Sequence, residues 1–317
     1  MTISRSALVA LTALPLLLTA CSGQDTSSAA GSGDGVSVVV GFYPMQFVAE
    51  RVGGDAVTVT NVTRPGAEPH DVELAPRDVE AFTTAAAIYY LPGFQPAVDS
   101  AIETAGAADR AVDVSPAAEL EPAPEGTEVH DDHAGEQADE HADTGLDPHF
   151  WLDPTRLASV TTLVADDLAA RDPEHAEQYR SNADALNADL MALDEHFATG
   201  LANCANTDLV TSHEAFGYLA RAYGLTQVGV SGLDPQQEPS PARLAELSAF
   251  VREHDVTTIY TETLASPAVA QTLADETGAG TAVLDPLEGL TDDSGDADYL
   301  SVMETNLGTL RAGQSCS

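Results

Sequence analysis

The sequence predicts an α/β protein with two lobes that are joined by one long helix. Short runs rich in β-branched residues alternate with helical patterns in both halves of the chain, which is typical of βα units around a mostly parallel sheet. Between these two series, apolar residues recur at spacings of three and four from Tyr179 to Leu201, which predicts a long amphipathic helix. The length of 317 residues also favours two domains.

The first series begins at Val36. We expect its strands in VSVVVGF, AVTVTNV, AIYYLPG and RAVDVS, and its helices in PMQFVAERVGG, APRDVEAFTTA and PAVDSAIETAG. From Pro116 to Gly145 the pattern stops, and an acidic stretch rich in Pro, Gly and Ala predicts a long mobile loop. Asp153 and Pro154 then fit the N-cap and first turn of a helix. The apolar face of that helix consists of Leu157, Val160, Val164 and Leu168.

Asp172 and Pro173 break this helix and start the long one, which we expect to end near Asn203. In the second series we expect strands in TDLVTS, LTQVGVSG, VTTIYTE and GTAVLD, and helices in EAFGYLARAYG, SPARLAELSAFVREH, SPAVAQTLADETG and DADYLSVMETNLGTLRAG. The predicted boundaries are therefore residues 36–172 for the N-terminal lobe, 173–203 for the connecting helix and 204–317 for the C-terminal lobe.

The first twenty residues have the features of an export signal. Arg5 precedes a short apolar core, and small residues precede Cys21. The pair Thr19-Ala20 before Cys21 resembles a bacterial lipobox, which implies cleavage before Cys21 and acylation of its sulfur. Residues 21–35 are small and polar, as a flexible tether requires. We therefore expect an extracytoplasmic protein held on the cell membrane by lipid.

The formal charge of −39, with no lysine in the chain, excludes binding to nucleic acid or anionic lipid through charge. Two cysteines remain after Cys21, namely Cys204 and Cys316. An exported protein meets oxidising conditions, so this pair predicts one disulfide. A cysteine zinc site is disfavoured because the chain has no CxxC motif.

Four residues that could bind a metal follow predicted strands. His70 follows the strand that ends near Val62, and His213 and Asp285 directly end later strands. His149 follows the strand near Val114 once the predicted loop is skipped. In open α/β sheets ligands bind outside the carboxyl ends of the strands, and three imidazoles with one carboxylate make a complete zinc set.

The other histidines are of two kinds. His175, His196 and His254 lie on predicted helices beside charged residues, so we expect them to face solvent. His130, His133 and His141 lie in the predicted loop among Asp, Glu, Gly and Ala. Without fixed geometry they could bind zinc only weakly; the alternative is a solvated acidic loop with incidental histidines.

Six segments resemble, in order, the substrate-binding lipoproteins of bacterial ABC-type zinc importers. They are GAEPHDVELAPRDV, DPHFWLDP, DPEHAEQYRSNADAL, SHEAFGYLARAYGL, GLDPQQEPSPARLAEL and VLDPLEGL, and they span nearly all of the chain after the tether. The resemblance implies two four-stranded lobes with one connecting helix and Zn²⁺ bound between them. It implies His70, His149, His213 and Asp285 as the ligands. It also implies a membrane permease and its ATPase as partners, and we expect a monomer that is not an enzyme.

Three alternatives to zinc capture stay open at this point. Manganese-type members of the family typically have a carboxylate where His213 stands, so a third imidazole favours zinc. A secreted zinc hydrolase would need an open metal position and a general base, for which Glu214 is a candidate. Glu214 and Glu262 are otherwise candidates for carboxylates that hydrogen-bond to the metal ligands or compete with them for the metal. A surface adhesin is a role also claimed for the family, but nothing in these residues argues for it.

Overall fold

The computed structural model describes residues 35–122, 145–291 and 294–317. Gly35–Ser317 form one compact unit. The predicted signal, Cys21, residues 21–34 of the tether and the histidines His130, His133 and His141 lie outside the described residues. Among the described residues, no helix is both long and apolar enough to cross a membrane.

The N-terminal lobe contains a sheet of four parallel strands in the order β2-β1-β3-β4. Its strands are β1 (Val36–Val40), β2 (Val57–Asn61), β3 (Ala87–Tyr90) and β4 (Ala111–Asp113). Its connections carry α1 (Tyr43–Gly53), η1 (Gly54–Ala56), α2 (Pro76–Thr84), α3 (Pro96–Thr104) and α4 (Ser115–Ala118). In this order the chain changes direction across the sheet between β1 and β3, which is where open α/β sheets bind ligands.

The C-terminal lobe repeats this arrangement with four parallel strands in the order β6-β5-β7-β8. Its strands are β5 (Asp208–Thr211), β6 (Thr226–Gly229), β7 (Thr258–Thr261) and β8 (Gly280–Val283). Its helices are α7 (Gly217–Ala222), α8 (Pro241–Glu253), α9 (Ala268–Thr277) and α10 (Tyr299–Gly313). The predicted fold class is confirmed, and the described strands of both sheets are all parallel.

Alternating strand residues bury both faces of each sheet, because successive side chains point in opposite directions. In β1, Val38 and Val40 join the main core, whereas Val39 packs on the other face with residues of α2 and α3. In β5, Leu209 joins the main core and Val210 packs with residues of α8 and α9. Each sheet is thus covered by helices on both sides, as parallel sheets require.

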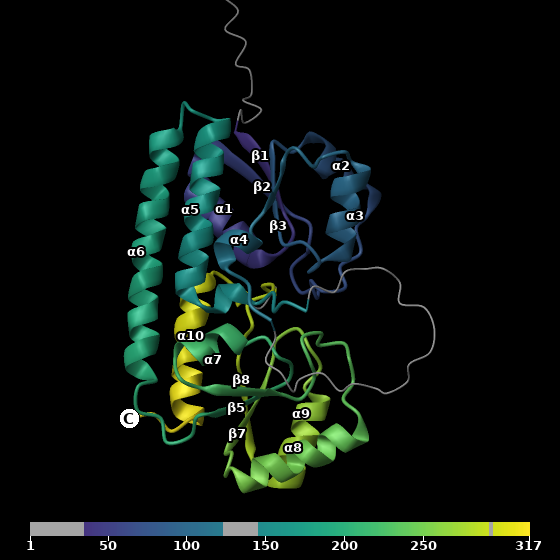
Figure 1. The fold of residues 1–317 in the computed structure, drawn as a ribbon, viewed down its shortest axis with the longest axis vertical. Coiled ribbons are helices and arrows are strands. Elements are labelled where there is room, and N and C mark those ends of the chain that lie inside the picture. Colours follow the sequence, from purple (N-terminus) through teal and green to yellow (C-terminus); the bar gives the residue numbers. More distant parts are fainter. Residues whose placement is uncertain (1–34, 123–144, 292–293) are drawn as a thin grey trace, which may run out of the picture. The chain divides into compact units, whose positions relative to one another are not determined.

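The helix that joins the lobes is α6 (Ala176–Gly200), which packs along α5 (Pro154–Arg171). Figure 1 shows α6 running alongside the N-terminal lobe and on to the C-terminal lobe, with α10 beside its C-terminal part. Asp153 caps α5 by accepting the N–H of Thr155, as predicted. The predicted apolar stripe of α6 is buried: Tyr179, Ala183, Leu186, Leu190, Leu193 and Phe197. One core therefore runs from the N-terminal sheet along α5 and α6 to the C-terminal sheet.

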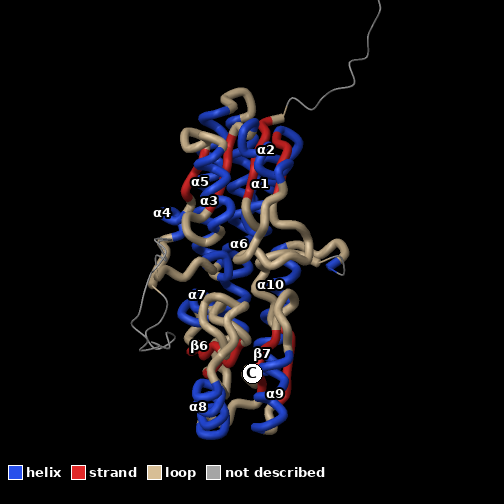
Figure 2. The backbone as a smooth tube through the Cα atoms, turned by 90° about the vertical axis from the view of Figure 1, so that its right-hand side faces the viewer, coloured by secondary structure: helices blue, strands red, loops and turns tan. Residues whose placement is uncertain are grey.

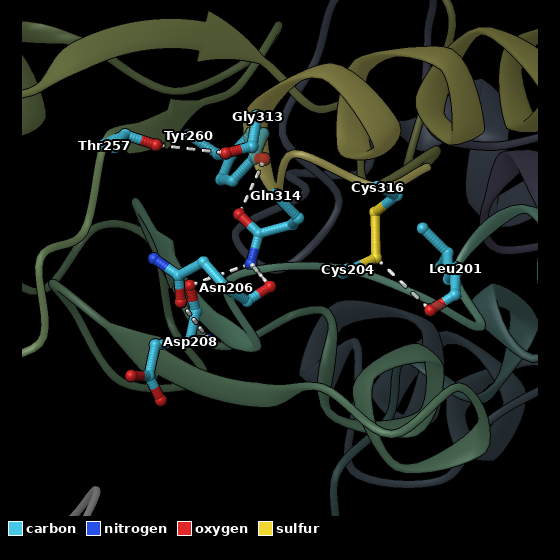
Figure 3. The surroundings of a disulfide bond; sticks show 9 residues. All are labelled: Leu201, Cys204, Asn206, Asp208, Thr257, Tyr260, Gly313, Gln314 and Cys316. Carbon is cyan, nitrogen blue, oxygen red and sulfur yellow. Dashed lines mark hydrogen bonds between the residues drawn. A yellow bond between two sulfur atoms is a disulfide. The ribbon is translucent and has the colours of Figure 1, made fainter.

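The predicted disulfide is confirmed. Cys204, just after α6, is bonded to Cys316 at the end of the chain (Figure 3). Beside it, Gln314 donates hydrogen bonds from Nε2 to the carbonyl oxygens of Asn206 and Asp208, and the Tyr260 hydroxyl donates to Oε1 of Gln314. The end of α10 is therefore held both covalently and by hydrogen bonds to the start of the C-terminal sheet.

Regular structure extends further into the predicted loop than the sequence suggested. Pro116 to Ala118 belong to α4, and Pro122 forms an antiparallel bridge with Leu146. Arg156 explains this order, because its guanidinium donates to the carbonyl oxygens of Ala118 and Glu119. The remaining part of the predicted loop, 123–144, lies outside the described residues.

Candidate metal centre

Four side chains from both lobes come together. They belong to loops, and Figure 2 shows loops gathered between the two sheets. His70 comes from the segment between β2 and α2, and His149 immediately precedes η2 (Phe150–Leu152). His213 follows β5, and Glu288 follows β8. Their potential ligand atoms all lie within 4.8 Å of one another. The two lobes thus contribute two residues each.

One carboxylate oxygen lies at the centre of this group. Oε1 of Glu288 is 3.1 Å from Nε2 of His149, 3.1 Å from Nε2 of His213 and 3.4 Å from Nε2 of His70. A tetrahedral zinc site with bonds of about 2.0–2.1 Å separates its donor atoms by about 3.3–3.4 Å. The three nitrogens therefore lie about as far from Oε1 of Glu288 as the donors of a zinc ion lie from one another.

The fourth member of the group corrects our prediction, because Glu288 stands where we expected Asp285. The Asp285 carboxylate instead accepts the N–H of Leu287 at 2.8 Å. The backbone of Asp285 is paired on both sides with the side chain of Asn306 in α10, at 3.0 and 2.7 Å. Leu287 then takes a left-handed conformation with φ of 58°. This turn directs Glu288, three residues later than Asp285, toward the histidines.

Glu262, which follows β7, contacts the ring nitrogen of His213 that lies away from Glu288. Oε2 of Glu262 is 2.6 Å from Nδ1 of His213, and its Oε1 accepts the backbone N–H of His213 at 3.0 Å. The carboxylate thereby assigns the Nδ1 proton and leaves Nε2 for a metal. β5 and β7 are neighbours at the direction change of the C-terminal sheet, which places the two residues side by side. Glu214 is also buried, and the carboxylate that contacts Nδ1 of His213 is that of Glu262.

His149 has the same kind of support, which the sequence did not reveal to us. Oδ1 of Asp147 is 2.9 Å from Nδ1 of His149 and also accepts the backbone N–H of His149 at 3.0 Å. Both residues are completely buried. The signal was present in the segment LDPHF, where an aspartate precedes the histidine by two residues and a proline stiffens the turn.

His70 is less enclosed than the other two histidines, since its side chain is 12% exposed. Its ring packs edge-on against Phe94 at 4.7 Å between centroids, and the backbone N–H of His70 donates to Oε1 of Glu68. The preceding carbonyl, of Pro69, accepts from Nε2 of Gln95. His70 therefore forms the partly open side of the site.

The charges of the group are strongly interdependent. Burial opposes charge on all of its members, but the three histidines together lower the pKa of Glu288 well below its ordinary value. Against the same burial, Glu262 and Glu288 raise the pKa of His213 well above 6.5, and Asp147 and Glu288 raise that of His149. Burial lowers the pKa of His70, and Glu288 offsets this only in part. Without metal, the neighbouring carboxylates therefore favour the protonated form of the two deeper histidines.

The remaining helix histidines are partly exposed and lie away from this group, as predicted. Each pairs through Nδ1 with a nearby carboxylate: His175 with Asp172, His196 with Glu304 and His254 with Asp208. These pairs connect surface elements and bring no second imidazole within reach in the described part of the chain.

This donor set agrees with the protein family that the whole chain matches. The family model described as "Zinc-uptake complex component A periplasmic" matches residues 38–313. The chain belongs to this family. The match covers both lobes and all four residues of the group, which confirms the resemblance seen in the six sequence segments.

Individual relatives agree. The high-affinity zinc uptake system protein ZnuA of Bacillus subtilis is 35% identical over 310 residues, which cover 96% of each chain. The zinc-binding lipoprotein AdcA of Streptococcus pneumoniae serotype 4 is 37% identical over 301 residues. That match covers 93% of this chain and 58% of AdcA, so the chain spans little more than half of that relative.

A solved structure shows the same fold. The crystal structure of the Zn(II)-bound ZnuA-like domain of Streptococcus pneumoniae AdcA aligns with a TM-score of 0.70 at 33% sequence identity. The alignment covers 88% of this chain and 99% of that domain. The family and these relatives are named for zinc binding and zinc uptake, not for an enzymatic reaction.

Proposed function

We propose that this protein captures Zn²⁺ outside the cytoplasm and delivers it to the permease of an ABC importer. His70, His149, His213 and Glu288 bind the ion between the two lobes. The observation that carries this proposal is the convergence of three Nε2 atoms on one oxygen of Glu288 at 3.1–3.4 Å. No further protein group has to move in to complete four-coordination.

Zinc fits this donor set better than manganese. Three imidazole nitrogens and one carboxylate oxygen suit Zn²⁺, whereas Mn²⁺ prefers more oxygen donors and a higher coordination number. Glu262 would be a second carboxylate, but it is directed to Nδ1 of His213 rather than to the centre of the group. A manganese-binding component of the same family is the alternative, and competition between the two ions separates them.

A zinc hydrolase is the less favoured reading. Four protein donors fill a tetrahedral site, whereas a catalytic zinc keeps one position for water or substrate. Glu214, which we considered as a general base, is buried next to His213 in the sequence. The carboxylate that contacts Nδ1 of His213 is that of Glu262. The relatives named for zinc uptake also favour transport over hydrolysis.

Transport requires the ion to leave the site again. His70 lies on the partly exposed side, and its segment between β2 and α2 contains no helix or strand. One apolar core passes through both lobes along α6, so we expect release by small rearrangements of the site loops rather than by wide hinge opening. The partners in this proposal are a membrane permease with its ATPase and, through acylated Cys21, the membrane lipid. The protein itself acts as a monomer.

A competition titration tests the proposal. Protein purified without added metal is analysed for bound ions, stripped, and titrated with zinc against a chelator in the presence and absence of manganese. The variants His70→Ala, His149→Ala and His213→Ala should each lose zinc affinity by orders of magnitude. His196→Ala is the matched control, because that histidine is exposed and paired with Glu304 far from the group. Near-native affinity in His149→Ala, or preference for manganese, would contradict the proposal.

A further inference from the structure

Each lobe donates a buried side-chain hydrogen bond to a carbonyl just before a metal ligand of the other lobe. Tyr218, in α7 of the C-terminal lobe, donates from its hydroxyl to the carbonyl oxygen of Asp147 at 2.8 Å. Trp151, in η2, donates from Nε1 to the carbonyl oxygen of Pro286 at 2.7 Å. Each acceptor lies two residues before a ligand, namely His149 or Glu288. We call these two contacts the cross-lobe hydrogen bonds.

The donor Tyr218 is fixed on several sides. The guanidinium groups of Arg156 and Arg221 lie over its ring, at 4.5 and 4.7 Å from the centroid. Both arginines also pair with the carboxylate of Glu121. The backbone N–H of Glu121 donates to the Tyr218 hydroxyl at 2.8 Å, which directs the hydroxyl proton toward Asp147. Tyr218 therefore makes more polar contacts than packing in an apolar core requires.

The donor Trp151 is fixed in a comparable way. Its ring packs against Phe42 and Phe94, at 5.1 and 5.8 Å between centroids. Its own carbonyl oxygen accepts the hydroxyl of Tyr299 in α10 at 2.5 Å. On the far side of the acceptor, the carbonyl of Glu288 accepts the N–H of Tyr43 at 3.4 Å. The segment that carries Glu288 is thus held by residues of the N-terminal lobe on both sides.

We propose that Tyr218 and Trp151 are positioning residues for the metal site, acting through the cross-lobe hydrogen bonds. This inference rests on the proposed function, since it concerns the same four ligands. His149 and Glu288 belong to different lobes, and their donor atoms, now 3.1 Å apart, must reach and keep the separation of about 3.3–3.4 Å that a tetrahedral zinc site sets. A metal site needs its ligands held to about 0.5 Å. Because each cross-lobe hydrogen bond ends two residues from a ligand, a small change between the lobes shifts both ligands together.

The two aromatic rings also pack in the core, so the test must remove the polar atom and keep the ring. Tyr218→Phe does this, and it leaves the arginines in place over an aromatic ring. Tyr260→Phe is the matched control: Tyr260 is also buried in the C-terminal lobe, and its hydroxyl donates to Gln314 rather than to a ligand segment. Trp151→Phe removes the indole N–H and is read together with the thermal stability of its metal-free form.

The full-length protein is probed with zinc and with Co²⁺. Competition titration gives zinc affinity, stopped-flow chelation gives the zinc dissociation rate, and the visible absorption of bound Co²⁺ reports the ligand geometry directly. Loss of one buried hydrogen bond corresponds to about a fivefold change. We expect Tyr218→Phe and Trp151→Phe to weaken zinc binding about fivefold each, mainly by faster dissociation, and to alter the Co²⁺ spectrum. Tyr260→Phe should match the wild type in all three measurements.

Wild-type affinity, dissociation rate and Co²⁺ spectrum in Tyr218→Phe would overturn the inference while leaving the proposed function intact. An equal loss in Tyr260→Phe would also overturn it, since the effect would then come from general destabilisation. A wild-type protein that binds no zinc tightly would instead overturn the proposed function, so the two failures are distinguishable.

Discussion

The carboxylate of Glu262 and the imidazole of His213 form a buried pair with 2.6 Å between Oε2 and Nδ1, held by neighbouring strands of one sheet. Asp147 and His149 form a second such pair in the other lobe, at 2.9 Å. In both pairs the carboxylate also accepts the backbone N–H of its histidine. Side chain and main chain are thus oriented by one group, which leaves each Nε2 directed at Glu288.

We expect Asp147→Asn and Glu262→Gln to weaken zinc binding about 10- to 100-fold, because an amide can also donate to Nδ1 and select the wrong tautomer. Asp172→Asn is the control, since Asp172 also contacts Nδ1 of a histidine, His175, but does so in the partly exposed turn before α6. Zinc competition titration measures the effect. Unchanged affinity in Asp147→Asn and Glu262→Gln would show that the two carboxylates serve only the fold.

The fourth ligand can be identified by exchanging each carboxylate for its amide. Glu288→Gln should lower zinc affinity by orders of magnitude, because the amide oxygen is a weaker donor and the site loses its negative charge. Asp285→Asn should have little effect, since an asparagine oxygen can still accept the N–H of Leu287. Titration of both variants decides the question. The opposite order of effects would restore Asp285 as the ligand.

The error over Asp285 shows what local sequence patterns could and could not predict. The β-branched runs and the apolar stripe of α6 predicted the sheets and the connecting helix because burial repeats with the period of the element. They also predicted that His70, His149 and His213 come together, because the carboxyl ends of parallel strands meet at one edge. The turn through Leu287 depends on Asn306 in α10, which is far away in sequence. No pattern within VLDPLEGL reveals which carboxylate that turn directs inward.

The hydrogen bonds that Tyr218 and Trp151 donate across the lobes could not be predicted from the sequence for the same reason. The sequence assigned neither residue a role, because their polar atoms find their partners only when the lobes meet. Asp147 was within reach of sequence reasoning, since it lies two residues from His149 in a proline-stiffened segment. The predicted pairing of Cys204 and Cys316 needed only their number and the export signal.

Zinc affinity should decrease on acidification, beginning above pH 6.5. The carboxylates around His149 and His213 raise the pKa of both above the ordinary 6.5 in the metal-free protein, so both histidines hold a proton to a higher pH than a free imidazole does. Zinc requires unprotonated Nε2 atoms and must release these protons, so binding strengthens as pH rises and weakens as it falls. Calorimetric titrations in buffers of different ionisation enthalpy count the released protons. Affinity that is constant from pH 6 to pH 8 would contradict this sign.

The disulfide should contribute to stability rather than to metal binding. Cys204 and Cys316 are 112 residues apart, so their bond restricts the unfolded chain strongly. Chain-entropy reasoning gives about 4–5 kcal/mol for such a loop, as an upper figure. We expect Cys204→Ser/Cys316→Ser to lose up to this amount in denaturant unfolding and to keep its zinc affinity while folded. Two free thiols in unreduced exported protein would show that the bond does not form.

Removal of residues 124–143 should leave high-affinity zinc binding nearly unchanged. The deletion keeps Pro122 and Leu146, which pair with each other, and Glu121, whose carbonyl accepts the N–H of Asp147. A short Gly-Ser linker can join the two ends, because the bridge already brings them together.

What the deletion removes is the set His130, His133 and His141, which lie outside the described residues. If they bind zinc weakly, the shortened protein loses that extra stoichiometry while the affinity of the main site stays the same. Because free imidazoles with pKa near 6.5 release metal as they protonate, the weak binding should disappear at a higher pH than tight binding does. Equilibrium titration of both proteins at several pH values gives both quantities. Loss of the tight site in a shortened protein that still folds would mean that one of these three histidines is a primary ligand, and the assignment of His70, His149, His213 and Glu288 would have to change.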